Sequence, residues 1–356
     1  MDFKSFSETI KDVIRDYLPD DYKDAKVELV EQQKLNEQYT GLMVRKEDQV
    51  ITPTVNLNQL FEAYEQGEYS FSEILNETAQ MVQMQPEGLD MSTLLDYDKA
   101  KDNLFIRVSN LENNQDKVAT APHVIHEDLV ITYHVVADID HDGVASTMIT
   151  NQMMEQYGIT QEQLHADAMK SSPELFPARV ESMGDVMKRM MMEDMKASGL
   201  SEEEINNMLA EMPMMDDSPM TVVTNDRSVN GAAVIFYPDQ MDEIAEKFGG
   251  DYFILPSSVH ELLVIPDTGE FNHNELRAMV QEVNATQVMP KDQLSGDVYH
   301  YDSKDRVFEK ADKFEQRQKT KAQERQGKRE KTDKSQEHGN NTPKPQKKHK
   351  SNDVSL

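Results

Sequence analysis

The sequence predicts a mixed α+β fold with mainly antiparallel sheets and with helices segregated from the strands. Strand-like stretches neighbour other strand-like stretches, and helical patterns come in blocks, whereas a parallel sheet would need strict alternation. No segment of 20 to 50 residues repeats, so a solenoid or propeller is not expected. The 356 residues divide where the composition changes. We expect an N-terminal part over residues 1–90, an α+β body over 91–303 and a charged tail over 304–356.

The N-terminal part is predicted to hold one helix, a strand meander and two further helices. Apolar residues at three- and four-residue steps predict the opening helix, which Pro19 ends. β-Branched and aromatic residues between polar breaks predict strands at 26–30, 39–45 and 50–55. Helices are expected at 57–66 and 71–84, the second opened by a capping box of Ser70 and Glu73.

The body combines more strands and helices. A helical stretch is expected around 97–109. The strongest strand pattern covers 129–137 and is followed by a strand at 144–150, with a hairpin-turn signal at Asp142-Gly143 and a helix cap at Asn151. Further strands are expected at 221–224, 232–236, 252–255, 259–265 and 298–301. Further helices are expected at 240–248 and 275–284.

Residues 181–220 form a methionine-rich insertion in the body. Eleven of the 23 methionines fall here, on two helical patterns separated by Gly199. The pattern predicts a helical hairpin. Methionine side chains are flexible and polarizable, so the hairpin either packs loosely on its own core or presents an adaptable surface to an apolar partner protein.

The charge is distributed unevenly along the chain. After Ser303 there are sixteen Lys and Arg residues against nine Asp and Glu residues, so this tail has a net charge of +7. The net charge of the whole chain is −29, so residues 1–303 carry about −36. A charged helix that extends the body is expected from the apolar residues Val307, Phe308, Ala311 and Phe314. From about Lys321 the sequence has too few apolar residues to offset the loss of conformational entropy on ordering. We expect a disordered basic tail there.

This charge distribution bounds the partners. A surface as acidic as the body repels nucleic acid and anionic lipid, which leaves solubility or a cationic protein partner as its roles. The basic tail suits weak electrostatic contact with nucleic acid or with the acidic body. It has no aromatic residue after Phe314 for base stacking.

Several classes of protein are disfavoured. The chain has no cysteine, which excludes disulfides and thiolate chemistry. Its first residues lack the pattern of a secretion signal, and no apolar run approaches the roughly 20 residues of a membrane span. We therefore expect a cytoplasmic protein without a membrane anchor. No nucleotide or kinase signature is present, and no cofactor is predicted.

Two patterns are candidate metal sites. Asp138, Asp140 and Asp142 match the first half of a calcium loop, but its twelfth position is Ile149 and strands flank it, so an acidic hairpin turn is the preferred interpretation. His123, His126 and Glu127 contain zinc-ligand types, although the order differs from that of zinc peptidases.

Ser258, His260 and Glu261 form the candidate catalytic cluster. On a strand, the first two would point to the same side and could serve as nucleophile and base. No nucleophile elbow is present, and neighbours on one strand seldom reach the required geometry, so a turn before a strand is the alternative.

The chain also resembles a known bacterial family, the domain of unknown function 5688. The resemblance covers most of residues 1–303. The segments that carry it are 53–55, 64–67, 126–129, 150–151, 177–178, 224–225, 231–233, 254–261 and 283–288. It implies no activity, ligand or cofactor, and the methionine-rich insertion and the basic tail depart from it.

Three functional hypotheses follow from these patterns. The leading one is a non-enzymatic binding or accessory protein, because each catalytic pattern fails on order, spacing or partner. The second is a hydrolase centred on Ser258, His260 and Glu261, with or without a metal ion. The third is a nucleic-acid-associated factor tethered by the basic tail.

Overall fold

The N-terminal part folds around its own hydrophobic core. The computed structural model describes residues 1–47, 54–84, 94–139, 144–211 and 218–339. Its first elements are α1 (Phe3–Val13), β1 (Lys26–Lys34), β2 (Glu37–Arg45), β3 (Thr54–Asn56), α2 (Leu57–Glu65) and α3 (Phe71–Gln83). The strands form an antiparallel sheet of order β1-β2-β3. The predicted capping box of Ser70 and Glu73 is present. Every residue of this core lies between Phe6 and Val82.

A second, four-stranded sheet follows. It consists of β4 (Leu104–Asn110), β5 (His123–His126), β6 (Leu129–Ile139) and β7 (Val144–Met148), and β6 pairs with the other three. The short helices α5 (Tyr97–Ala100) and α6 (Gln115–Val118) flank β4, and α7 (Asn151–Tyr157) and α8 (Gln161–Leu175) follow β7.

The prediction of a helix around 97–109 is wrong beyond Ala100. Leu104, Ile106 and Val108 are buried in one core, because alternate residues of a strand share a face. Asn151 is the first residue of α7, and the residue that caps the helix is Thr150, whose hydroxyl accepts from the N–H of Met153.

The third sheet has six antiparallel strands in the order β13-β12-β10-β11-β9-β8. They are β8 (Ala178–Ser182), β9 (Thr221–Asn225), β10 (Tyr252–Leu255), β11 (Leu262–Pro266), β12 (Tyr299–Asp302) and β13 (Val307–Lys310). Helices α11 (Gln240–Phe248) and α12 (His273–Thr286) belong to the same region. Its core is continuous with that of the second sheet, since residues from Ala100 to Tyr301 form one buried cluster.

Three predictions are corrected here. Residues 232–236 are not a strand but part of a buried 3₁₀ helix, Gly231–Phe236. The strand expected at 259–265 begins only at Leu262. Residues 307–310, expected to be helical, pair with β12 as strand β13. Each segment has too few apolar residues in a row for periodicity to separate strand from helix.

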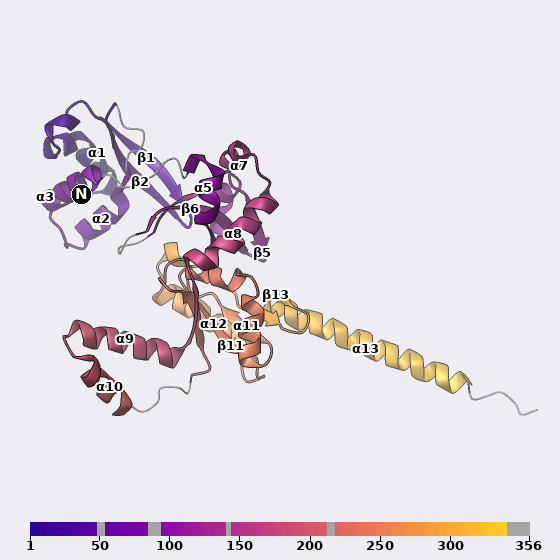
Figure 1. The fold of residues 1–356 in the computed structure, drawn as a ribbon. Helices are drawn as coiled ribbons and strands as arrows, with labels where there is room; N and C mark the ends of the chain where they lie inside the picture. The colour runs from indigo at the N-terminus through magenta and orange to yellow at the C-terminus, as the bar shows by residue number, and fades with distance from the viewer. Residues whose placement is uncertain (48–53, 85–93, 140–143, 212–217, 340–356) are drawn as a thin grey trace, which may run out of the picture.

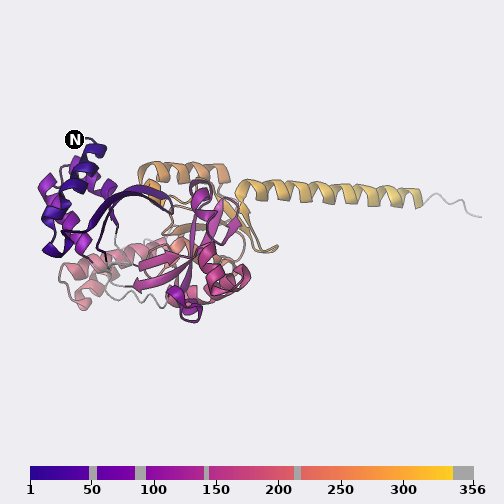
Figure 2. The same ribbon diagram turned by 90° about the horizontal axis from the view of Figure 1, so that it is seen from above.

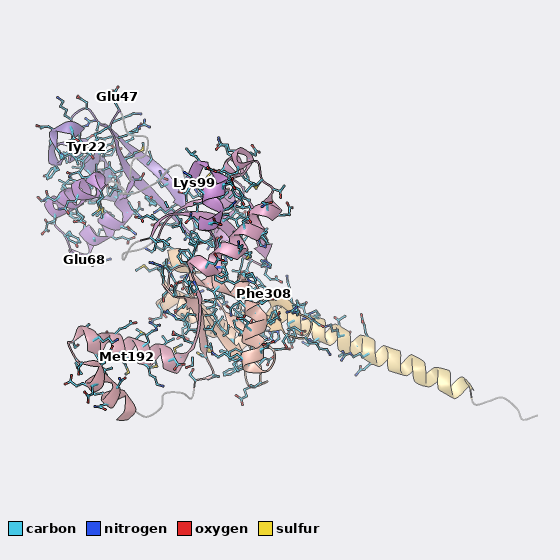
Figure 3. All side chains as sticks on the ribbon, viewed as in Figure 1. Tyr22, Glu47, Glu68, Lys99, Met192 and Phe308 are labelled. Atoms are coloured by element: carbon cyan, nitrogen blue, oxygen red, sulfur yellow. The ribbon has the colours of Figure 1, made fainter. Side chains whose placement is uncertain are left out.

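The methionine-rich insertion is a helical hairpin, as predicted. It consists of α9 (Met183–Ala197) and α10 (Glu202–Glu211) and leaves the sheet between β8 and β9, where Ser182 pairs with Thr221. Figure 1 shows the hairpin projecting from the rest of the molecule. In Figure 3 Met192 lies on α9, well apart from Phe308 at the start of the C-terminal region. Met187, Met190 and Met208 are exposed.

The chain continues into one long helix, α13 (Ala311–Gly339), which extends away from the body in both views (Figures 1 and 2). The helix passes Lys321, where we expected order to end, and residues 340–356 of the predicted tail lie outside the described residues. Its first turns are held by ion pairs: Arg317 contacts Asp302, Asp305 and Glu309. In the described part of the chain, no helix combines the length and the apolar character that crossing a membrane requires.

A candidate basic pocket where three segments meet

One pocket of about 670 Å³ lies where three parts of the fold converge. The turn between β1 and β2 forms one wall. The second sheet supplies residues of β4, β6 and β7, and the third wall contains Asn230, His260, Lys291 and Asp292. Figure 1 shows β1 and β2 reaching from the N-terminal helices toward β6 and α5. The pocket therefore depends on all three segments being held together.

Arg107 is the central residue of the pocket. It lies in β4, opposite Thr132 of β6, between two residues that face the core, so its side chain leaves the sheet on the opposite face. Within the described residues it has neither a hydrogen bond nor an ion pair, and its Nε is buried. Loss of hydration lowers the pKa of the Arg107 guanidinium to about 10. The group still carries a positive charge at neutral pH.

Among the described residues that line the pocket, cations outnumber carboxylates. Lys34, Lys117 and Lys291 join Arg107, whereas the acids are Glu37 and Asp292. Both acids already have partners. Glu37 Oε1 accepts from Asn56 Nδ2 at 2.9 Å, and Asp292 Oδ1 lies 3.3 Å from His260 Nε2. A positive site inside a chain of net charge −29 requires a specific explanation.

Two buried polar side chains complete the sheet wall. His134 is 3% exposed, and its Nε2 lies 3.0 Å from the hydroxyl of Thr132. Burial, together with the charges of Arg107 and Lys117, holds the pKa of His134 well below its usual value, so the ring is neutral near pH 7. The hydroxyl of Ser109 is buried and has no hydrogen-bond partner among the described residues.

Asn36 anchors the β1–β2 turn to the rest of the pocket. The residue has a positive φ of 60°, a conformation that asparagine tolerates better than most residues. Its N–H donates to Asn114 Oδ1 at 2.6 Å, and its Nδ2 donates to the carbonyl of Gln293 at 3.2 Å. Asn114 in turn donates to Asn36 Oδ1. These bonds fix the wall that carries Lys34.

The candidate catalytic residues lie in the loop before β11, not on a strand. The hydroxyl of Ser258 accepts from the backbone N–H of His260 at 3.0 Å, and not from its ring. The ring is held between the N–H of Asn230, 3.3 Å from Nδ1, and Asp292. Glu261 is exposed. The structure therefore does not bring these residues together as a nucleophile and base, and only His260 lines the pocket.

The candidate zinc ligands are dispersed. His123 and His126 are three apart on β5, so their side chains leave opposite faces. His123 Nδ1 lies 2.9 Å from the carbonyl of Ala121, and His126 stacks on Phe236 with ring centroids 4.8 Å apart. Glu127 forms an ion pair with Lys313. Across the described ranges, no three His, Asp or Glu side chains form a group that could hold a metal ion.

The candidate calcium ligands are only partly described. Asp138 lies at the end of β6, opposite Ala145 of β7, so the two strands form the predicted hairpin. Asp140 and Asp142 lie outside the described residues.

Sequence reasoning missed most of the pocket. Arg107 and His134 come together through the pairing of β4 with β6, and Lys117 comes from the helix α6. Lys34 and Lys291 are more than 250 residues apart in the sequence. The sequence feature that could have pointed to the pocket is Arg107, a charged residue inside the apolar run 104–108. We had assigned this run to a helix.

The fold and the pocket define a class: an α+β protein with three antiparallel sheets and a basic pocket where its segments meet. Residues 3–303 match the family of unknown function DUF5688, and the chain belongs to that family. No curated protein and no solved structure matches the chain.

Proposed function

We propose that this protein binds a small anionic ligand in the basic pocket. The observation that carries the proposal is Arg107, a half-buried cation with a buried Nε and without a counter-charge in the described part of the chain. Removing a charge from water costs several kcal/mol unless a partner compensates it. An anion bound in the pocket would supply the missing negative charge beside Arg107.

Binding is favoured over hydrolysis by the contacts of the Ser258 loop. The Ser258 hydroxyl accepts from a backbone N–H, and both ring nitrogens of His260 have other partners. A serine hydrolase needs its base within hydrogen-bond reach of the nucleophile. The loop instead shapes one wall of a binding site.

A nucleic-acid role for the C-terminal region receives less support. The basic side chains on the first turns of α13 are taken up by the protein's own acids. Lys313 pairs with Glu127, Arg317 with three carboxylates and Lys321 with Asp305. They would have to exchange these partners for phosphates.

The test compares wild type with Arg107→Met in thermal unfolding. Phosphate or sulfate is added against chloride at equal ionic strength, and Lys170→Met on the exposed face of α8 is the matched control. We expect both anions to raise the Tm of wild type and of Lys170→Met clearly more than that of Arg107→Met, in which only the general stabilising effect of these salts remains. We also expect Arg107→Met to be more stable than wild type without added anion, because a half-buried charge without a described partner is gone.

The opposite pattern would overturn the proposal. If Arg107→Met is destabilised in chloride and responds to both anions like wild type, the guanidinium is structural. The variant comparison is essential because phosphate and sulfate also stabilise folded proteins by exclusion from their surfaces.

A further inference from the structure

We propose that the ligand is a small organic phosphate monoester, bound as its dianion. This inference rests on the proposed function, because it requires that the pocket binds an anion. It adds the charge of the ligand, the shape of its charged group and the presence of an organic body.

The charge follows from the side chains that line the pocket. Among the described residues of the lining, four cationic side chains face two carboxylates, which leaves a formal excess of two positive charges. Both carboxylates are engaged by Asn56 and His260, so they do not neutralise Arg107. A ligand with two negative charges balances this excess, whereas a monoanion leaves one positive charge of the described lining uncompensated.

The donors favour a tetrahedral group. The guanidinium fork of Arg107 can hold two oxygens of a phosphate or a carboxylate. Ser109, two residues further along β4, is only 1% exposed, and its hydroxyl has no partner in the described part of the chain. Lys117 comes from α6, close enough for its charge to act on His134. A phosphate monoester has three terminal oxygens to accept from donors on different sides, and a carboxylate has two.

The size and lining indicate an organic body. A volume of about 670 Å³ falls within the range of sites that take whole small molecules and far exceeds the need of a bare oxyanion. Val144, Ala145 and Met148 of β7 and Val259 add apolar surface to the lining. An organic substituent would cover this surface while the phosphate meets the cations.

The experiment measures binding of phenyl phosphate and phenyl sulfate to the full chain by calorimetry at pH 7.5 and pH 5.5. The two probes share a body and a tetrahedral group, but the sulfate ester carries one charge at both pH values. The phosphate monoester has a second pKa near 6, so its dianion fraction falls about fourfold between them.

Phenyl phosphate should bind at least about tenfold more tightly than phenyl sulfate at pH 7.5, and its affinity should fall about fourfold at pH 5.5. The pocket's own ionisable groups are Lys34, Glu37, Arg107, Lys117, His134, His260, Lys291 and Asp292. Phenyl sulfate reports their titration separately. Protonation of a pocket histidine at pH 5.5 would strengthen the binding of either probe, whereas loss of the dianion weakens the binding of phenyl phosphate.

The outcomes separate this inference from the proposed function. Equal affinity for both probes, lost in Arg107→Met, would overturn the dianion while leaving anion binding in place. Inorganic phosphate binding as tightly as phenyl phosphate would overturn the organic body. If neither ester nor inorganic phosphate binds at millimolar concentration, both proposals fail.

Discussion

Asn36 and Asn114 hydrogen-bond to each other in both directions across the junction between the N-terminal part and the second sheet. The Asn36 N–H donates to the Asn114 side chain, and the Asn114 amide donates back and also to the carbonyl of Asn110. Asn114 is 1% exposed. The N-terminal core shares no buried residue with the larger one, so these bonds bear directly on how the two parts are held together.

Asn114→Ala should loosen this junction. The change leaves the Asn36 N–H without its acceptor, which costs about 1–3 kcal/mol at a buried site. Hydrogen exchange at residues 33–37 should become faster while the strands of the N-terminal sheet stay protected. Asn113→Ala, at the exposed neighbouring position, is the control and should exchange like wild type. Unchanged protection in Asn114→Ala would show that other contacts hold the turn.

Gly231→Ala should be strongly destabilising. A Cβ at this position would lie within 3 Å of the His260 carbonyl and of the Asn225 backbone nitrogen, which belong to two other segments of the pocket region. Overpacking of this kind costs typically about 1–3 kcal/mol. Gly250→Ala is the matched control, since its Cβ would meet open space. Urea unfolding measures both, and a Gly231→Ala variant as stable as Gly250→Ala would refute the close packing.

The buried His134 should make stability depend on pH. Its pKa is lowered in the folded protein, so the unfolded chain binds a proton more readily. The contribution of the neutral His134 to the free energy of unfolding is complete above the pKa of the unfolded state, about 6.5. It is lost as the pH falls below that value, by up to about 2 kcal/mol between pH 7 and pH 5. Glutamine cannot take up this proton.

The stability of His134→Gln relative to wild type should therefore improve by about that amount on acidification. Urea unfolding at pH 7, 6 and 5 measures the difference, with His273→Gln on α12 as the control for loss of a histidine. A difference that stays constant with pH would contradict a neutral buried ring.

The methionine-rich hairpin should be dispensable for folding. The described side chains of residues 184–208 are absent from the hydrophobic clusters, and β8 and β9 already pair at the base of the hairpin. Met183 N–H also donates to the Met220 carbonyl. Replacing residues 184–219 by Asn-Gly should close a tight hairpin. The shortened chain should melt cooperatively within a few degrees of full-length protein, whereas loss of cooperative unfolding would show that the hairpin supports the body.

Local patterns in the sequence were sufficient for much of the fold. The capping box at Ser70 and the paired helices around Gly199 depend on residues within a few positions of one another, so their signals are contained in short windows. The hairpin of β6 and β7 was predictable for the same reason. Membership in the family also followed from the sequence, but the function of this family is unknown.

Tertiary structure decided the pocket and the elements around it. Short apolar runs such as 104–110 and 232–236 are compatible with either strand or helix. Which of the two forms depends on the neighbouring elements that cover each run. Arg107 matters because its position in the fold leaves it half-buried and without a counter-charge among the described residues. No window of sequence contains both Lys34 and Lys291, so the assembly of a basic pocket in an acidic chain follows only from how the three segments pack together.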